Sequence, residues 1–565
     1  MAFVSRLLSQ GLQSAAKVRK NVRHQQLAFA STNSSIIDEE MNIDRELTGK
    51  CPFAGKSMAA TQASGAYRDR PVNYRKAKKF DEVPKPYSLP LLGSSISVMR
   101  EGGTQYLHEY IDRRHKELGP IFKDRTSAFN SIDIVFIASN KLMQHVYLNE
   151  GKHPIHLVPE SWTLYNQVKN VQRGLFFMDG PEWRQLRSIL EKMFLDREHI
   201  SKFTSVFNEV ITDLIYAWTA KSDHVTSANG ETKRIALIDE LEKDLYKWSI
   251  ESLGAMIFGR RLGCIPSAHV LSSEFERLHE FVACVQQIFV ESAKMTLIPA
   301  KYAYKFNLPM WKRFERAANG AITLARSYVE ENMRNTSRSE TADSVLKNLF
   351  AEKHITREMV CSIIVDLFIA AADTTSHGTQ WSLYLLAKNP QCQQRLYDEI
   401  NSAIKKDEII EERHLKQLPY VRCIIKEALR LYPIAPFISR IITRDIVLGG
   451  YHVPKGKLIA MSLYTTGRDE KYFKDAQSFK PERWFRDPSK TLEERTFNAY
   501  ACLPFGFGPR SCIGRRVAEL QMQLLLARTV QKFKLEPECE EDINIKLRMI
   551  TTPEKAIHLR FKERD

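Results

Sequence analysis

Cysteine pairs, long apolar runs and internal repeats are all missing from this 565-residue sequence. Its nine cysteines include no CxxC pair, which argues against a zinc site or a secreted disulfide framework and favours a reducing compartment. No run of about 18 consecutive apolar residues occurs, so the sequence predicts no transmembrane helix. Any attachment to a membrane is then expected to be monotopic.

The composition describes a large folded chain with an excess of positive charge. Apolar residues make up 43% of the sequence and aromatic residues 10%, which argues against general disorder. Lys and Arg number 83 against 67 Asp and Glu, a formal charge of +16. That charge favours an acidic protein partner, an anionic membrane surface or nucleic acid, and composition alone leaves all three open.

Acidic residues are absent from the first 37 positions, where arginines and lysines alternate with Leu, Val, Ser and Ala. This pattern is typical of a mitochondrial transit peptide, here assigned to residues 1–36, although a disordered basic tail would have a similar composition. Residues 37–79 are polar and rich in Ala, Gly and Ser, which indicates a poorly ordered linker. One domain is expected over residues 80–565.

Within that domain, helical periodicity predominates and strand patterns are short. Helices are predicted at 106–118, 182–194, 240–258, 274–293, 312–334, 356–388 and 391–405. Strands are predicted at 132–138, 438–448, 457–462 and 555–561, with turns at Gly449-Gly450 and Lys455-Gly456. The predicted fold is therefore mainly α with small peripheral β-sheets, and no flexible linker interrupts it after residue 80.

The most informative passage is a loop that presents Cys512 at the start of a helix, Phe505-Gly-Phe-Gly-Pro-Arg-Ser-Cys-Ile-Gly-Arg-Arg516. Its glycines permit tight turns and the close approach of a large planar group, and main-chain N–H groups can point at the sulfur. The positive end of the following helix predicts that Cys512 is a thiolate. A loop around a merely structural cysteine would leave Arg510 and the double arginine unexplained.

This FxGxRxC loop resembles the haem-binding signature of the cytochrome P450 family, and the resemblance extends over nearly the whole chain. It implies the P450 fold, a helical haem-binding domain that carries haem b (iron protoporphyrin IX). It further implies that Cys512 is the axial ligand to the iron, that Arg510 contacts a haem propionate, and that Phe505 and Gly514 border the cofactor.

Two further motifs resemble motifs that have structural roles in this family. Glu427 and Arg430, three positions apart on a predicted helix, match the ExxR pair, and Arg483 in Pro-Glu-Arg-Trp matches the arginine that completes a buried structural network with them. An ExxR pair alone also occurs by chance on many helices. Its position upstream of Cys512, with the second arginine between them, supports the match.

Other residues match the family's contacts to the haem propionates. Trp183 and Arg187, at i and i+4, resemble its WxxxR clamp, and Arg440 resembles a third contact. The alternative for the first pair is a half-buried tryptophan beside a surface arginine.

The predicted central helix contains Ala371, Ala372, Asp373 and Thr374 among small residues, although Asp and Thr are poor residues for a helix interior. This segment resembles the family's oxygen-activation site, in which Asp373 and Thr374 would deliver protons. Ala371 stands where the family usually has glycine. Taken alone, the threonines would more simply bond back to their own helix.

Arg422 and Lys426 share one helical face just before Glu427. A solvated basic face is the simple interpretation, but mitochondrial P450s carry two basic residues at these places to dock an acidic ferredoxin. The resemblance therefore implies an adrenodoxin-like mitochondrial ferredoxin, with its NADPH-dependent reductase, as electron donor, and no nucleic acid as partner. No residues remain for fused flavin domains.

The apolar and aromatic segment 295–306, interrupted by lysines, suits peripheral contact with the matrix side of the inner mitochondrial membrane, or else a buried structural loop. The walls of the substrate pocket are expected at 175–178, 364–371, 434–438 and 550–552, which are mostly apolar.

Residues 173–180 resemble arthropod P450s of ecdysteroid synthesis, such as an ecdysteroid 2-hydroxylase, which implies a sterol or ecdysteroid precursor as substrate. Oxidation of lipophilic xenobiotics is the alternative within the family. A P450-fold isomerase or a haem sensor, to which Cys51-Pro52 gives a faint hint, is the alternative outside this reaction class.

Overall fold

The computed structural model describes residues 77–89, 92–126, 132–226, 232–265, 272–295, 298–336, 344–405, 408–485 and 499–564. These residues all belong to one compact unit, Tyr74–Asp565. The predicted transit peptide and almost all of the predicted linker lie outside the described residues, and so does the Cys51-Pro52 hint.

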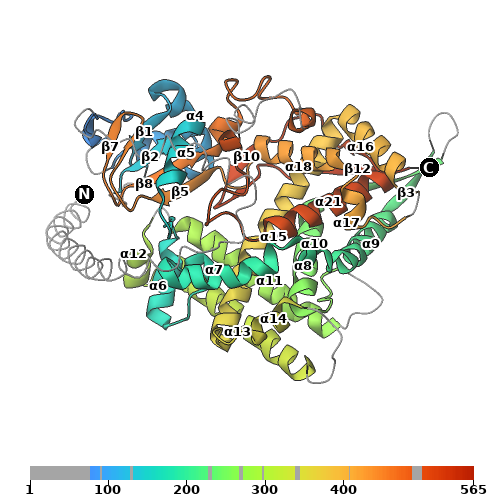
Figure 1. Cartoon of the computed structure of the whole chain (residues 1–565). Coiled ribbons are helices and arrows are strands. Elements are labelled where there is room, and N and C mark those ends of the chain that lie inside the picture. The colour runs from blue at the N-terminus through green and yellow to red at the C-terminus, as the bar shows by residue number, and fades with distance from the viewer. Residues whose placement is uncertain are drawn as a thin grey trace, which may run out of the picture. The chain divides into compact units, whose positions relative to one another are not determined.

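Helices dominate the described chain, as the periodicity predicted (Figure 1). The first half of the chain contains α3 Ser95–Arg100, α4 Leu107–Leu118, α5 Asn140–Asn149, α6 Glu160–Lys169, α7 Gly180–Phe194, α8 Arg197–Ser201, α9 Thr204–Ala220, α10 Leu241–Phe258 and α11 Ser272–Lys294. The second half contains α12 Ala300–Lys305, α13 Pro309–Thr336, α14 Val345–Ala351, α15 Arg357–Lys388, α16 Pro390–Ala403, α17 Glu412–Leu415, α18 Pro419–Leu431, α19 Leu463–Gly467 and α21 Arg515–Lys532. Short 3-10 turns include Leu175–Phe177 and Pro481–Trp484.

The strands form four small sheets. The first has the order β1-β2-β8-β5, built from Ile121–Asp124, Ile134–Ile137, Leu458–Ser462 and Phe437–Ile441, and only its β2–β8 pair is parallel. The second has the order β3-β4-β12-β9, built from Ser222–Thr226, Thr232–Ile238, Leu559–Glu563 and Phe533–Pro537. The two-stranded sheets pair β6 Ile446–Leu448 with β7 Tyr451–Val453, and β10 Ile545–Leu547 with β11 Thr551–Pro553.

The β-rich stretch predicted at 438–448 is confirmed as two strands, β5 and β6, which belong to different sheets. The predicted turns are confirmed: Gly449, Gly450 and Gly456 have positive φ angles of 61°, 87° and 83°, which favour glycine.

Helix α15 runs through the main hydrophobic core. The Thr356 hydroxyl caps its start by accepting from the Met359 N–H at 3.2 Å, and nearly every residue from Thr375 to Ala387 is buried. Within the described residues, α15 is the one helix long and apolar enough to cross a membrane, but 67% of that stretch lies inside the fold. A helix that is apolar on all sides and covered by protein is a core helix.

Candidate active site around Cys512

The loop before α21 folds tightly around Cys512. Gly506 and Gly508 adopt φ angles of 69° and 75°, and the Cys512 N–H donates to the Phe505 carbonyl at 2.8 Å. Any side chain at Gly514 would touch the Cys512 Sγ at 4.0 Å, so the main chain passes close to the sulfur. The Cys512 side chain itself is exposed. The loop therefore presents one thiol with main-chain groups around it, as the sequence predicted.

Opposing influences act on the Cys512 thiol. Surrounding protein raises its pKa above the usual value, and the Gly514 N–H, Arg187 and Arg515 offset this only in part. A coordinated metal ion deprotonates a thiol outright. The thiolate therefore stays a prediction for the metal-bound site.

Arg510 joins this loop to the start of α7. Its Nε donates to the Pro154 carbonyl at 2.8 Å, its Nη2 donates to an Asp179 carboxylate oxygen at 2.6 Å, and its guanidinium lies 3.8 Å from the centre of the Trp183 ring. Burial lowers the pKa of Arg510 to about 10, and Arg440 and Arg187 also lower it, against the effect of Asp179. The pairing of Asp179 with Arg510 was not predicted from the sequence.

Trp183 and Arg187 lie one turn apart on α7, and both are buried. Among the described residues, the Arg187 Nε donates to Glu191 at 2.9 Å. Nearby, both ring nitrogens of His156 are buried without a hydrogen-bond partner, and burial followed by Arg510 and Arg440 lowers its pKa to about 3. Orphaned donors beside several guanidinium groups fit an acidic ligand.

Arg440 is held on β5 by a carboxylate that the sequence did not reveal. Glu150, which directly follows α5, forms a buried ion pair with the Arg440 Nε. A side chain at Gly508 would approach a Glu150 carboxylate oxygen to 2.5 Å, so the glycine leaves room for this pair. Arg440, Arg510 and Arg187 thus come from three separate elements to one region beside the Cys512 loop.

The Cys512 loop presents a thiol, its glycines leave space around it, and it lies next to a cluster of arginines. This arrangement fits a planar metal cofactor with acidic side groups. Residues 83–561 match the cytochrome P450 family. The chain belongs to the cytochrome P450 family. It is accordingly a P450 monooxygenase with a haem iron cofactor, and the donor set described above fits that group.

Curated relatives support the mitochondrial type. The chain is 34% identical to cytochrome P450 315a1, mitochondrial, of Drosophila melanogaster over 86% of this chain and 90% of that protein. It is 29% identical to the mitochondrial 1,25-dihydroxyvitamin D(3) 24-hydroxylase of Rattus norvegicus, over 85% and 89% of the two chains. It is also 29% identical to the mitochondrial sterol 26-hydroxylase of Rattus norvegicus, over 91% and 96%.

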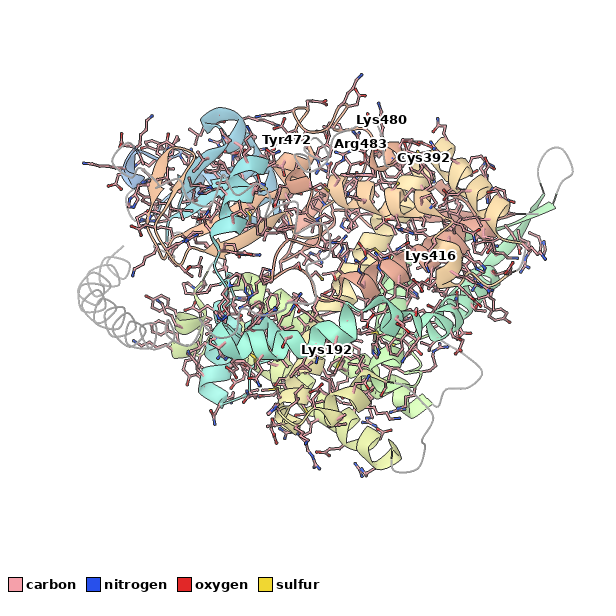
Figure 2. The ribbon with its side chains drawn as sticks, viewed as in Figure 1. Lys192, Cys392, Lys416, Tyr472, Lys480 and Arg483 are labelled. Atoms are coloured by element: carbon pink, nitrogen blue, oxygen red, sulfur yellow. The ribbon has the colours of Figure 1, made fainter. Side chains whose placement is uncertain are left out.

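One buried network joins Glu427, Arg430 and Arg483. The two Glu427 carboxylate oxygens accept from Arg430 at 2.7 and 2.9 Å, from Arg483 at 2.9 Å and from the Trp484 indole N–H at 2.8 Å. Arg430 also donates to the Gly467 and Ala476 carbonyls, both at 2.6 Å. Figure 2 labels Arg483 near Lys480, whose N–H completes the set at 2.9 Å from Glu427. Trp484 is the member that sequence reasoning missed.

Asp373 and Thr374 lie on α15, which continues without a break through this segment. The Thr374 hydroxyl donates to the Ala370 carbonyl at 2.7 Å, the local bond that the simpler interpretation expected. Burial raises the pKa of Asp373, and His377 on the next turn partly offsets this. The structure therefore places a carboxyl with a raised pKa beside a hydroxyl, with no direct hydrogen bond between the two side chains.

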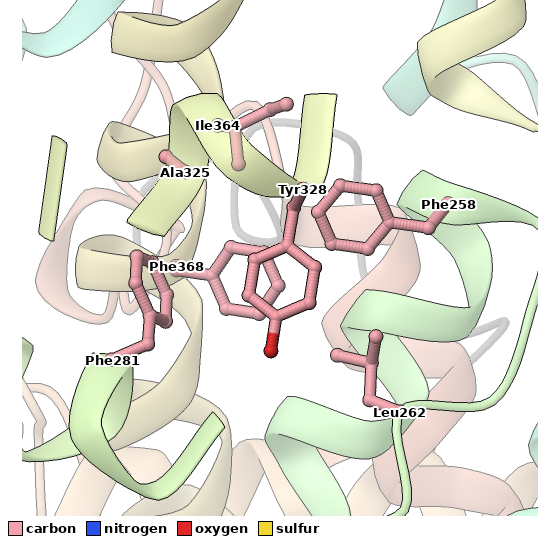
Figure 3. Close-up of a pocket in the computed structure, with 7 residues that line it drawn as sticks. All are labelled: Phe258, Leu262, Phe281, Ala325, Tyr328, Ile364 and Phe368. Atoms are coloured by element: carbon pink, nitrogen blue, oxygen red, sulfur yellow. The ribbon is translucent and has the colours of Figure 1, made fainter. Parts of the chain in front are cut away.

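The pocket-wall prediction is wrong for part of α15. Ile364 and Phe368 point into an apolar cluster with Phe258, Phe281 and Tyr328 (Figure 3), which leaves no space for a water molecule. This cluster is tightly packed core, because Ile364 and Phe368 face the neighbouring helices.

Asp366, on another side of α15, is a buried carboxyl that sequence reasoning overlooked. It accepts from the Phe176 N–H at 2.9 Å, and burial raises its pKa to about 7. A side chain at Gly174 would lie 2.2 Å from its Oδ2 atom. Asp366 therefore fixes the predicted 175–178 wall against the central helix.

Arg422 and Lys426 are both exposed on α18. Arg422 donates to the Leu415 carbonyl at 3.0 Å, whereas the Lys426 ammonium lies 3.9 Å from the centre of the Trp484 ring. Arg422 also lines a surface groove together with Arg197, Lys416, Arg516, Glu412 and Glu519. Burial lowers the pKa of Arg516, and repulsion from Arg197, Arg515 and Arg422 adds to this effect. Positive charge is thus concentrated on this face.

Proposed function

We propose that this P450 inserts one oxygen atom of O2 into a sterol or ecdysteroid precursor, with electrons from an adrenodoxin-like ferredoxin and its NADPH-dependent reductase. The observation that carries the proposal is the Cys512 loop beside the arginine cluster. The names of the relatives support the substrate class, since they include a sterol 26-hydroxylase and a cholesterol side-chain cleavage enzyme. Oxidation of lipophilic xenobiotics is the competing assignment.

The chain's residues would hold haem b in the following way. Cys512 would bind the iron through Sγ, while Trp183, Arg187, Arg440 and Arg510 would donate to the two carboxylates. Phe505 and Gly514 would border the ring. When bound, the haem supplies the reduction of oxygen and its insertion into the substrate. The protein would supply orientation, a sulfur ligand and protons.

Asp373 and Thr374 are proposed to supply the protons. A carboxyl whose pKa is raised by burial holds a proton more readily than a solvated carboxyl and can release it to a neighbouring group. The Thr374 hydroxyl, which now donates to Ala370, would rotate to pass that proton onward. A P450-fold isomerase or a haem sensor would have no use for such a pair.

A spectral titration tests the class of reaction and the substrate together. Purified protein, reduced and exposed to carbon monoxide, should give a thiolate-type Soret band. The ferric protein should then shift from low to high spin with cholesterol, 1,25-dihydroxyvitamin D3 or 2-deoxyecdysone. The band without any shift would remove the steroid assignment and leave the enzyme class. A folded, haem-loaded protein without the band would overturn the proposal.

Charge neutralisation on α18 should weaken ferredoxin docking. We expect the double variant Arg422→Gln/Lys426→Gln to bind ferredoxin roughly tenfold more weakly at low ionic strength, because opposite charges steer the encounter and their attraction is screened by salt. The comparison is Lys555→Gln, an exposed lysine near β11 that pairs with Glu541 at 3.2 Å. Equal affinity and equal salt dependence in the double variant and the wild type would contradict this docking face.

The proposed location is the matrix side of the inner mitochondrial membrane, with peripheral attachment. Segment 295–306 includes the short helix α12, in which Ala300 and Ala303 are buried. Tyr304 in this helix and Phe306 just after it are exposed, and the exposed fraction of Phe306 is 65%. Exposed aromatic rings beside Lys301 and Lys305 suit the interfacial layer of a bilayer.

A further inference from the structure

A polar seam crosses the otherwise apolar interface between α10 and α15, which pack side by side (Figure 1). On α10, Glu242 and Ser249 lie two turns apart on one face. The Glu242 carboxylate lies 3.6 Å from the Nε2 of His377, and the Ser249 hydroxyl donates to the Ala371 carbonyl at 3.2 Å. Ser249 and His377 are buried, and buried polar groups are costly unless partnered, so this row of polar contacts between two helices calls for an explanation.

The outer end of this seam reaches solvent. The Glu242 side chain is 53% exposed, whereas His377 is only 4% exposed. Contact with His377 lowers the pKa of Glu242 below its usual value, and Arg548 adds to this effect. Glu242 is therefore an anion at the surface whose carboxylate faces a buried imidazole.

The inner end reaches Asp373. The His377 Nδ1 lies 2.7 Å from the Asp373 carbonyl oxygen, one helical turn away, and can donate to it. Burial alone would lower the pKa of His377, but Glu242 and Asp373 outweigh burial, and the net pKa is raised. In turn, the charge of His377 lowers the pKa of Asp373 against the opposing effect of burial. Tyr246 on α10 also faces Asp373.

We propose that Glu242 and His377 form a positioning pair for Asp373 that connects this carboxyl electrostatically to the protein surface. The inference rests on the proposed role of Asp373 in proton delivery. Glu242 stabilises the imidazolium form of His377. The imidazolium holds the Asp373 turn through the carbonyl bond, and its charge keeps the Asp373 carboxyl able to lose its proton.

An ordinary structural ion pair would not produce the same consequences. A pair with one exposed partner contributes little to stability, so a purely structural role predicts that loss of Glu242 changes almost nothing. The positioning role predicts a change in proton delivery while the fold and substrate binding stay unchanged.

The decisive variant is Glu242→Gln, compared with Glu240→Gln. Glu240 is an exposed carboxylate just before α10 that pairs with Lys243, so it matches the lost charge without contacting His377. Hydrogen exchange at the imidazole C2 position, followed by mass spectrometry of the full-length protein, reports the pKa of His377 directly. We expect Glu242→Gln to lower it and Glu240→Gln to leave it unchanged. An unchanged His377 in Glu242→Gln would overturn the proposal.

Coupling of electrons to product gives the second readout. With reductase, ferredoxin and 2-deoxyecdysone, the fraction of NADPH electrons recovered as product should fall roughly three- to tenfold in Glu242→Gln, less than the loss expected for an acid–base group itself. The imidazolium is lost as pH rises through the His377 pKa. Because that pKa is expected to be lower in Glu242→Gln, the coupling of electrons to product should begin to fall at a lower pH in this variant than in the wild type. The other charged or titratable groups beside this pair are Tyr246, which faces Asp373, and Arg548, which acts on Glu242.

Thr374→Ala separates the two possible failures. If Thr374→Ala uncouples the enzyme while Glu242→Gln does not, the positioning pair is wrong and proton delivery stands. If neither variant uncouples it, proton delivery through this segment has failed, and the pair falls with it.

Discussion

Replacing Cys512 with alanine is expected to abolish the thiolate-type carbon monoxide spectrum and all monooxygenase turnover while leaving the fold intact. The sulfur is proposed as the iron ligand. The Cys512 side chain is exposed, so its loss opens no cavity in the core. The spectrum, turnover and thermal midpoint of the purified variant give the three readouts.

Cys502→Ala is the matched control. Cys502 is a buried free thiol ten positions earlier in the chain, and burial raises its pKa to about 12. Its replacement removes a thiol close in sequence to Cys512 and should leave the thiolate-type band in place. A Cys512→Ala protein that retained the band would exclude Cys512 as the ligand.

Replacing Glu427 with alanine should destabilise the protein by roughly 3–5 kcal/mol, the range for breaking a buried ion pair. Glu427 and Arg430 are both 0% exposed, and the lost carboxylate also serves Arg483 and Trp484. The buried Arg430 guanidinium and the partly buried Arg483 guanidinium would lose this counter-charge. Urea unfolding, followed by far-ultraviolet circular dichroism, would measure the change.

Asp475→Asn is the comparison for Glu427→Ala. Asp475 pairs with Lys480 in the same stretch of chain, but both side chains are 48% exposed. Its φ angle of 52° is one that asparagine also adopts. This variant should unfold at the same urea concentration as the wild type. Equal midpoints for Asp475→Asn and Glu427→Ala would show that the Glu427 network contributes nothing to stability.

The Cys512 loop was predictable because its chemistry is local. Glycines that adopt positive φ, a cysteine and a following helix lie within ten residues, so short-range sequence reports the geometry. The same applies to Glu427 and Arg430, which one helical turn brings together. Helix positions were predicted for the same reason, since a periodic apolar face is read directly from neighbouring residues.

Predictions from the sequence failed where the outcome depends on packing between segments far apart in the chain. The apolar periodicity of α15 did not reveal that Ile364 and Phe368 face Phe258 and Phe281. Tertiary packing decides which side of a core helix meets which neighbouring helix.

The sequence by itself determined the class of protein, the cysteine and the arginine-rich residue types of the site, because these follow from local motifs and periodicity. Only the tertiary structure decided the pairings of Glu150 with Arg440, Asp179 with Arg510 and Glu242 with His377. The partners in these pairs stand 290, 331 and 135 positions apart in the chain. Charges so far apart meet only after hydrophobic packing has brought their helices and strands together, and no local pattern encodes that meeting.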